Sequence, residues 1–284
     1  MAPEAGRLRL TTIGRPIVLR VPTNRAILVL SLLALVAGLV TRLLQGETVG
    51  ASLIGGLQWA GSVFLAWALA RETDPDRWYS AFIAAAGALA GVVLLGPPSF
   101  LLLFWFVIGL RYINRTTGTA PGLLDFVALY GIALWLGVTA HWTIPLFTLP
   151  TVLFADIQRF PKPLRIALPL ALPAAAAIMG AGQGWHFLVS DWGWLEIGVL
   201  SAVALLAVPV IVSYRSVKSV GDRTGEPLRP HRVQWGLGWG VAAAVILSFS
   251  GTSAIQDLGP LWAAFAGTSL GWASERLVKG PGLR

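Results

Sequence analysis

The sequence predicts an all-α protein, a polytopic bundle of about ten transmembrane helices joined by short loops. The first observation is composition, because 56% of the 284 residues are hydrophobic and only 12% are charged, which is far from a soluble globular domain of this size. The second is that the apolar residues form long blocks and not amphipathic stripes. The third is that Lys and Arg gather in every second loop between those blocks.

Ten apolar segments are the predicted spans, at residues 26–44, 49–70, 79–95, 100–113, 123–140, 143–157, 166–181, 194–214, 235–255 and 261–274. At about 1.5 Å per residue the first reaches roughly 28 Å, enough to cross the hydrocarbon core. Pro97 and Pro98 separate the third segment from the fourth, because proline cannot continue a helix. Two short apolar segments in succession are also typical of a re-entrant hairpin. Omitting such a pair leaves eight spans with the same parity, so the prediction is eight to ten.

The chain divides into three parts. Residues 1–25 are a basic, proline-containing segment predicted to lie in the cytoplasm or at its membrane interface. Residues 26–274 form the transmembrane domain, and residues 275–284 form a cytoplasmic tail. A cleaved signal peptide is the competing interpretation of the first part. The long charged region and the spanning length of the next apolar run argue against it.

The charge distribution predicts the orientation. If the N-terminus is cytoplasmic, Arg42 alone among the 21 Lys and Arg falls in an outer connection. The outer connections instead hold acidic residues, namely Glu47, Asp191, Glu196 and Asp257. By the positive-inside rule, the sequence predicts a multi-pass protein of the cell (plasma) membrane with both termini in the cytoplasm.

The basic character also indicates the partners. The formal net charge is +8, but the cations are mostly Arg and lie between apolar blocks, as expected for contacts with lipid headgroups. We therefore expect membrane lipids as partners, with other membrane subunits as a further class, and no nucleic acid. The chain has no cysteine, which excludes disulfides and thiolate sites, and its three histidines have no metal-ligand spacing. No metal and no cofactor is predicted.

Few polar residues fall inside the predicted spans. Gln58 and Tyr130 are the mid-span polar groups, and Asp125 lies near the cytoplasmic start of the fifth span. Asp125 is close enough to the interface to reach the headgroups by snorkelling. An ion- or proton-coupled transporter would usually place an acid near the bilayer centre, where a charge is costly. The nearly uncharged interior therefore does not favour that class.

The inner loops contain a candidate site for magnesium and a diphosphate. Its acids are Asp74, Asp76, Asp156 and Asp222, and the arginines near them in sequence are Arg77, Arg159 and Arg223. Carboxylates at a membrane surface can hold Mg²⁺ while arginines bind a diphosphate. In two loops the pattern resembles the aspartate-rich motifs of UbiA-type prenyltransferases, although the acids at 72–76 are too closely spaced for that motif and Asp156 has no second acid downstream. The alternative is that each acid lies at the rim and pairs with its own neighbouring arginine.

Three functions remain open. A carrier or scaffold for apolar or lipid-like molecules comes first, because the interior is nearly uncharged. A membrane-embedded transferase acting on a lipid diphosphate comes second. A structural subunit of a membrane complex comes third, since Gly- and Ala-rich helix faces allow close packing. No catalytic residue is assigned, and whether the protein is an enzyme stays open.

Overall fold

The computed structural model describes residues 11–15, 17–155, 157, 160–185, 192–249 and 255–279. Within these residues the protein is all-helical, which confirms the predicted fold class. The ten helices are α1 (Pro22–Leu44), α2 (Val49–Thr73), α3 (Trp78–Leu95), α4 (Phe100–Asn114), α5 (Leu123–Thr139), α6 (Thr143–Phe154), α7 (Lys162–Gln183), α8 (Trp194–Ser213), α9 (Pro230–Phe249) and α10 (Gly259–Lys279). An isolated antiparallel bridge joins Val220 to Pro227 in the α8–α9 loop.

Five of the helices are long and apolar enough to cross a membrane, namely α1, α2, α3, α7 and α8. Three more, α4, α5 and α6, are apolar but only 15, 17 and 12 residues long. The remaining two, α9 and α10, have 20 and 21 residues. They carry Gly, Ser, Thr and Trp among their apolar residues, and many of these side chains are buried inside the bundle.

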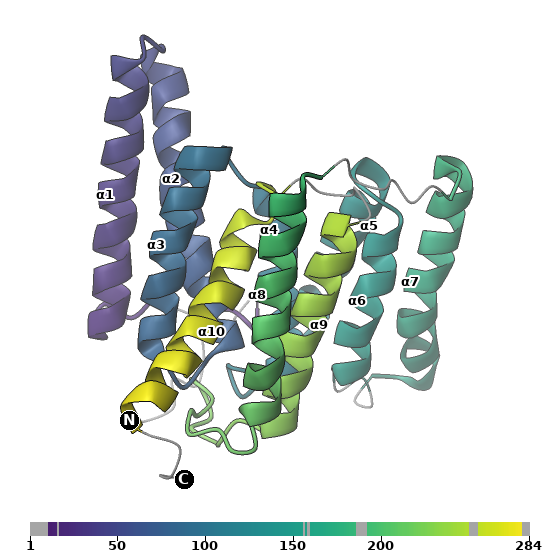
Figure 1. Cartoon of the computed structure of the whole chain (residues 1–284). Helices are drawn as coiled ribbons and strands as arrows, with labels where there is room; N and C mark the ends of the chain where they lie inside the picture. Colours follow the sequence, from purple (N-terminus) through teal and green to yellow (C-terminus); the bar gives the residue numbers. More distant parts are fainter. Residues whose placement is uncertain are drawn as a thin grey trace.

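The helices run side by side, up and down (Figure 1). One group, α1 to α3, lies on the left of the view, and α5 to α7 lie on the right. Between them α4 packs against α2, α5, α6 and α9, while α10 packs against α2, α3 and α8. The α1–α2 hairpin extends beyond the other helices at the top of the view.

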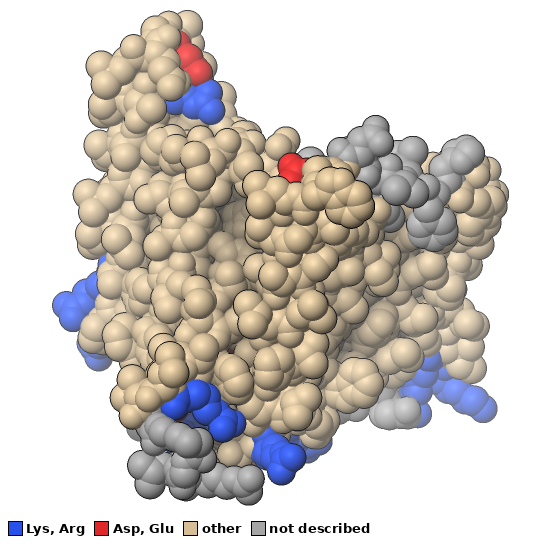
Figure 2. Space-filling model, in the orientation of Figure 1, with Lys and Arg blue, Asp and Glu red and all other residues tan. Residues whose placement is uncertain are grey.

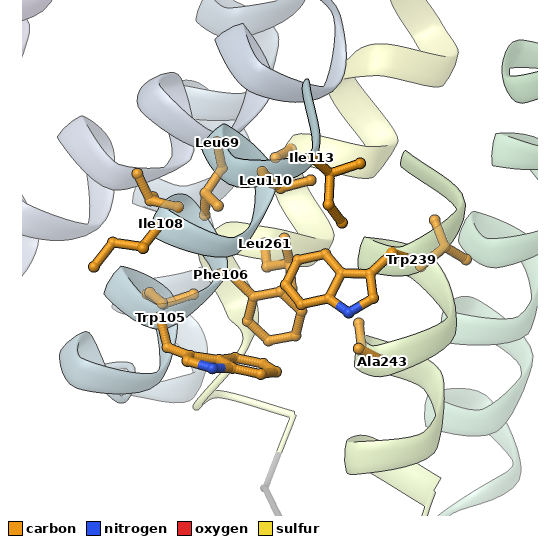
Figure 3. Close-up of a cluster of buried hydrophobic side chains, with 14 of the residues drawn as sticks. Leu69, Trp105, Phe106, Ile108, Leu110, Ile113, Trp239, Ala243 and Leu261 are labelled. Carbon is orange, nitrogen blue, oxygen red and sulfur yellow. The ribbon is translucent and has the colours of Figure 1, made fainter. Parts of the chain in front are cut away.

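An aromatic cluster fills the centre of the bundle, where α4 meets α9 (Figure 3). Trp105 and Phe106 of α4 lie with ring centroids 5.4 and 5.5 Å from that of Trp239 of α9. The indole N–H of Trp239 donates to the carbonyl of Phe147, at 2.7 Å, so this polar atom is satisfied in an apolar setting. A Cβ at Gly109 would clash with the Trp239 ring, which explains why α4 has glycine there.

Small residues let two other helix pairs approach closely. A Cβ added to Gly38 of α1 would lie 3.0 Å from the Cα of Gly56 of α2. Gly267 of α10 faces the backbone of α3 at Ser80 and Ala84 in the same way. Such contacts replace the hydrophobic driving force that is missing between helices in lipid.

The two ends of the bundle differ in the charged residues that they carry. We call the end where α2, α4 and α8 finish, and where α1, α3 and α9 begin, the basic end. Lys and Arg gather along this end, at the bottom of Figure 2. At the opposite end the tip of the α1–α2 hairpin carries the Arg42–Glu47 ion pair, whose atoms are 2.7 Å apart.

Candidate functional site

The basic end contains a completely buried acid, Glu72, in the last turn of α2. Its carboxylate accepts hydrogen bonds from Arg111 at 3.0 Å, Arg15 at 3.1 Å and the Thr116 hydroxyl at 2.6 Å. Its backbone carbonyl accepts a further one from the side chain of Asn114, at 2.6 Å. Three donors to the carboxylate, two of them arginines, compensate the cost of burying this charge. The sequence prediction did not include Glu72 in the site.

Asp74 lies just after α2 and is also buried. Its carboxylate accepts from Ser80 at 2.6 Å, Tyr214 at 2.7 Å and Arg77 at 3.1 Å. Burial raises the pKa of Asp74 above its ordinary value, and the Arg77 charge and these hydrogen bonds oppose that shift only in part. Arg77 also pairs with Glu275 of α10, at 2.5 Å. Asp74 therefore ties together α2, α3 and α8.

Asp76 holds the α8–α9 loop against the α2–α3 turn. It accepts the backbone N–H of Ser219 at 2.8 Å and that of Lys218 at 3.1 Å. The Ser219 hydroxyl donates to the Pro75 carbonyl at 2.8 Å, which fixes the same two segments from the other side. Asp76 thus positions the backbone of the α8–α9 loop, and among the described residues it forms no ion pair with an arginine.

Asp222 pairs with Arg15, at 2.5 Å, and not with its sequence neighbour Arg223 as the rim arrangement would require. The guanidinium of Arg223 instead donates to the Gly14 carbonyl, at 2.7 Å. Burial lowers the pKa of Arg15, but the carboxylates of Glu72 and Asp222 outweigh this and leave that pKa raised. Arg15 therefore bridges a buried acid and a surface acid, and its charge is committed to both.

The N-terminal residues are packed into this end of the bundle. Ile13 is buried in the main hydrophobic core. The carbonyl of Thr12 accepts from the Thr119 hydroxyl at 2.8 Å, and the Thr12 hydroxyl oxygen accepts from the Gly122 N–H at 2.9 Å. Residues 11–15 thus fill the space between the α4–α5 and α8–α9 loops, while Leu19 and its neighbours are exposed.

Asp125 completes the contact of α5 with the N-terminal residues. It is only 3% exposed. Its carboxylate accepts from the hydroxyls of Thr11 and Thr12, the latter at 2.6 Å, and from the Gly122 N–H at 2.8 Å. The expectation that Asp125 snorkels to the headgroups was wrong, because the sequence could not reveal that residues 11 and 12 cover it.

The other two polar residues predicted inside the bundle have structural contacts. Tyr130 of α5 donates to the carbonyl of Leu168 in α7, at 2.5 Å, and so links two neighbouring helices. Gln58 is half-buried in α2, and its backbone carbonyl accepts from the Ser62 hydroxyl at 2.7 Å. Neither contact involves a charged group.

The predicted magnesium and diphosphate residues are therefore only partly brought together. Asp74, Asp76, Asp222, Arg77 and Arg223 all lie at the basic end, and each acid accepts hydrogen bonds from protein donors. Asp156 and Arg159 lie outside the described residues. Among the described residues, no three His, Asp or Glu side chains are grouped to hold a metal ion. The site is best described as an ion-pair network centred on Glu72.

Two cavities open at or near the basic end. A polar pocket of about 290 Å³ lies between the α2–α3 turn, the α8–α9 loop and the N-terminal residues, lined by Arg15, Arg71, Pro75, Thr116, Lys218, Ser219, Val220, Asp222 and Leu228. A shallow apolar groove of about 670 Å³ lies between the first half of α1 and the start of α3, lined by Arg25, Ala26, Val29, Leu30, Trp78 and Phe82.

The described residues thus form a bundle of apolar helices with a membrane-like architecture, and its basic end has two cavities at or near it. No protein-family model matches the chain, and no match was found among curated proteins or solved structures.

Proposed function

We propose that this chain is a multi-pass protein of the cell membrane that acts as a scaffold for lipid-like molecules, which bind at its surface. The observation that carries the proposal is the groove between α1 and α3. Its apolar walls are formed by Ala26, Val29, Leu30, Trp78 and Phe82, and Arg25 lies at its basic end. An acyl chain would cover the apolar walls, while an anionic headgroup would meet the guanidinium.

Two further features support a scaffold over a carrier. The centre of the bundle is filled by Trp105, Phe106 and Trp239, whose rings are in mutual contact. The groove opens sideways on the outer surface of α1, where Val29 is 56% exposed and Leu30 is 41% exposed. A lipid can enter such a groove from the bilayer without crossing the protein. Membrane lipids are therefore the partners that we propose.

Anionic lipid should be retained in the groove through Arg25. We expect native mass spectrometry of the protein in micelles with equal amounts of phosphatidylglycerol and phosphatidylcholine to show more phosphatidylglycerol adducts. The enrichment should be about fivefold, as expected for one cation near a lipid headgroup. Arg25→Gln should bring the two adducts to near equality, because it removes the charge and leaves the apolar walls.

Arg20→Gln is the matched control for this measurement. Arg20 is an exposed arginine of the same N-terminal region but does not line the groove. Its replacement should leave the adduct ratio unchanged. Equal ratios for the wild type and Arg25→Gln would refute the proposed role of the groove.

The proposed orientation places the basic end in the cytoplasm, as the positive-inside rule requires. The chain has no cysteine, so single cysteines can be introduced and labelled in intact cells. Glu226 is exposed in the α8–α9 loop, and Gln256 is exposed at the opposite end. Glu226→Cys should react with a membrane-impermeant maleimide only after lysis, and Gln256→Cys before it. The reverse pattern would invert the orientation.

A further inference from the structure

The polar pocket at the basic end carries more positive charge than its own acid can match. Three cationic side chains line it, Arg15, Arg71 and Lys218, and one carboxylate does so, Asp222. Arg15 is already engaged by Asp222 at 2.5 Å and by Glu72 at 3.1 Å. The charges of Arg71 and Lys218 are therefore in excess.

The contacts of Arg71 and Lys218 leave both cationic groups able to bind an anion. Within the part of the chain that the structure describes, the Arg71 guanidinium donates one hydrogen bond, a long one of 3.4 Å to the Pro75 carbonyl. The backbone N–H of Lys218 binds Asp76, but its ammonium group forms no hydrogen bond or ion pair with a described residue. Arg71 is half-buried at the end of α2, and Lys218 is exposed.

A half-buried guanidinium with a single long hydrogen bond is an unusual arrangement. By comparison, Arg111 of the neighbouring helix α4 pairs with Glu72 at 3.0 Å. Removing a cation from water is costly unless an anion or several acceptors replace the solvent. A guanidinium presents parallel N–H donors that match the oxygens of a phosphate or carboxylate, and an ammonium group adds a mobile point charge.

From this geometry we propose that the pocket between Arg71 and Lys218 binds a phosphate-bearing anion, either a phosphorylated small molecule or the phosphate headgroup of a lipid. The volume of about 290 Å³ exceeds the needs of a bare ion and is near the lower limit of small-ligand sites. A group with two negative charges fits two cations in excess, which favours a phosphomonoester or diphosphate over a carboxylate. This site is separate from the apolar groove and does not depend on it.

Calorimetric titration of the full chain in detergent, with inorganic phosphate and pyrophosphate at constant ionic strength, tests the proposal. Pyrophosphate should bind more tightly than phosphate because it offers more negative charge. Arg71→Gln should weaken pyrophosphate binding by at least about tenfold, the loss expected for a charge-assisted hydrogen bond. Lys218→Gln changes an exposed side chain that forms no hydrogen bond or ion pair with a described residue, so it should weaken pyrophosphate binding by a smaller factor. It serves as the informative variant if Arg71→Gln does not fold.

Asp222→Asn should change the affinity for pyrophosphate in the opposite direction. This carboxylate faces the pocket and would repel a bound anion, so its replacement should tighten pyrophosphate binding. A merely structural role of the cluster would not produce a gain. Arg25→Gln should leave pyrophosphate binding unchanged, so failure of the groove proposal would not imply failure of this one.

Nanodiscs separate the two sources of the phosphate. If phosphatidic acid in the disc weakens pyrophosphate binding and phosphatidylcholine does not, the ligand is a lipid headgroup. If the two discs give the same affinity, it is a soluble phosphorylated molecule. The proposal would be overturned if pyrophosphate did not bind, if Arg71→Gln and Lys218→Gln both bound it as the wild type does, or if Asp222→Asn weakened binding.

Discussion

Replacing Glu72 with glutamine should destabilise the folded protein by about 3–5 kcal/mol, the usual cost of removing one partner of a buried ion pair. Glu72 is completely buried and is contacted by Arg15 and Arg111, whose side chains are 20% and 18% exposed. Glutamine keeps the shape but leaves both guanidinium groups without this charge. Unfolding in mixed micelles with increasing SDS fraction, followed by circular dichroism, measures the loss.

Glu47→Gln is the matched control. The Arg42–Glu47 pair has the same chemistry and a shorter distance, 2.7 Å, but both side chains are about a third exposed. An exposed pair contributes about 1 kcal/mol or less, so this variant should unfold nearly as the wild type does. Similar losses in the two variants would mean that burial of Glu72 does not decide the stability of the basic end.

Gly267→Ala should also destabilise the bundle, by about 1–3 kcal/mol or more, as overpacking does in a tight core. A Cβ at this position would lie 2.6 Å from the Ser80 carbonyl oxygen and 2.8 Å from the Ala84 nitrogen. Both atoms belong to the backbone of α3 and cannot rotate away, so α3 and α10 must separate. The midpoint of thermal unfolding, followed by tryptophan fluorescence, reports the change.

Gly91→Ala tests whether the effect is specific to the contact. Gly91 lies inside α3, the helix that Gly267 of α10 contacts, but a Cβ at Gly91 would meet no atom within 4 Å. Alanine in a helix interior is favoured over glycine by roughly 0.5–1 kcal/mol, so this variant should be as stable as the wild type or more so. A lower midpoint for Gly91→Ala than for Gly267→Ala would contradict the proposed packing of α3 on α10.

The helices could be predicted from the sequence because each is an apolar block with a polar or proline-containing boundary. The predicted segment at residues 100–113 became α4 (Phe100–Asn114), and that at 194–214 became α8 (Trp194–Ser213). Two boundaries differ by five residues, since α10 ends at Lys279 and not at residue 274, and α9 begins at Pro230 and not at residue 235. Proline is tolerated in the first turn of a helix. Residues 230–234, most of which are polar, therefore form the start of α9, before the apolar block begins.

From the sequence, only the loops that contribute to the candidate site could be predicted, and not the contacts within it. The sequence predicted Asp74, Asp76, Asp156 and Asp222 in the inner loops. In the structure Asp74, Asp76 and Asp222 lie at the basic end, and Asp156 lies outside the described residues. It could not show that Glu72 is the centre of the network, because Arg15 and Arg111 are 57 and 39 residues away along the chain. Nothing local indicates such a pairing. The polar pocket likewise depends on the meeting of three loops.

The position of the N-terminal residues has a consequence for biosynthesis. Arg15 pairs with Asp222, 207 residues later, and Arg223 donates to the Gly14 carbonyl, 209 residues earlier. A chain is made from its N-terminus, so these partners appear only after eight helices have been synthesised. Contacts between distant residues form slowly because the intervening loop must first be closed. Residues 11–15 are therefore synthesised before any of the ten helices but are among the last to reach their final place, and until then Glu72 lacks the charge of Arg15.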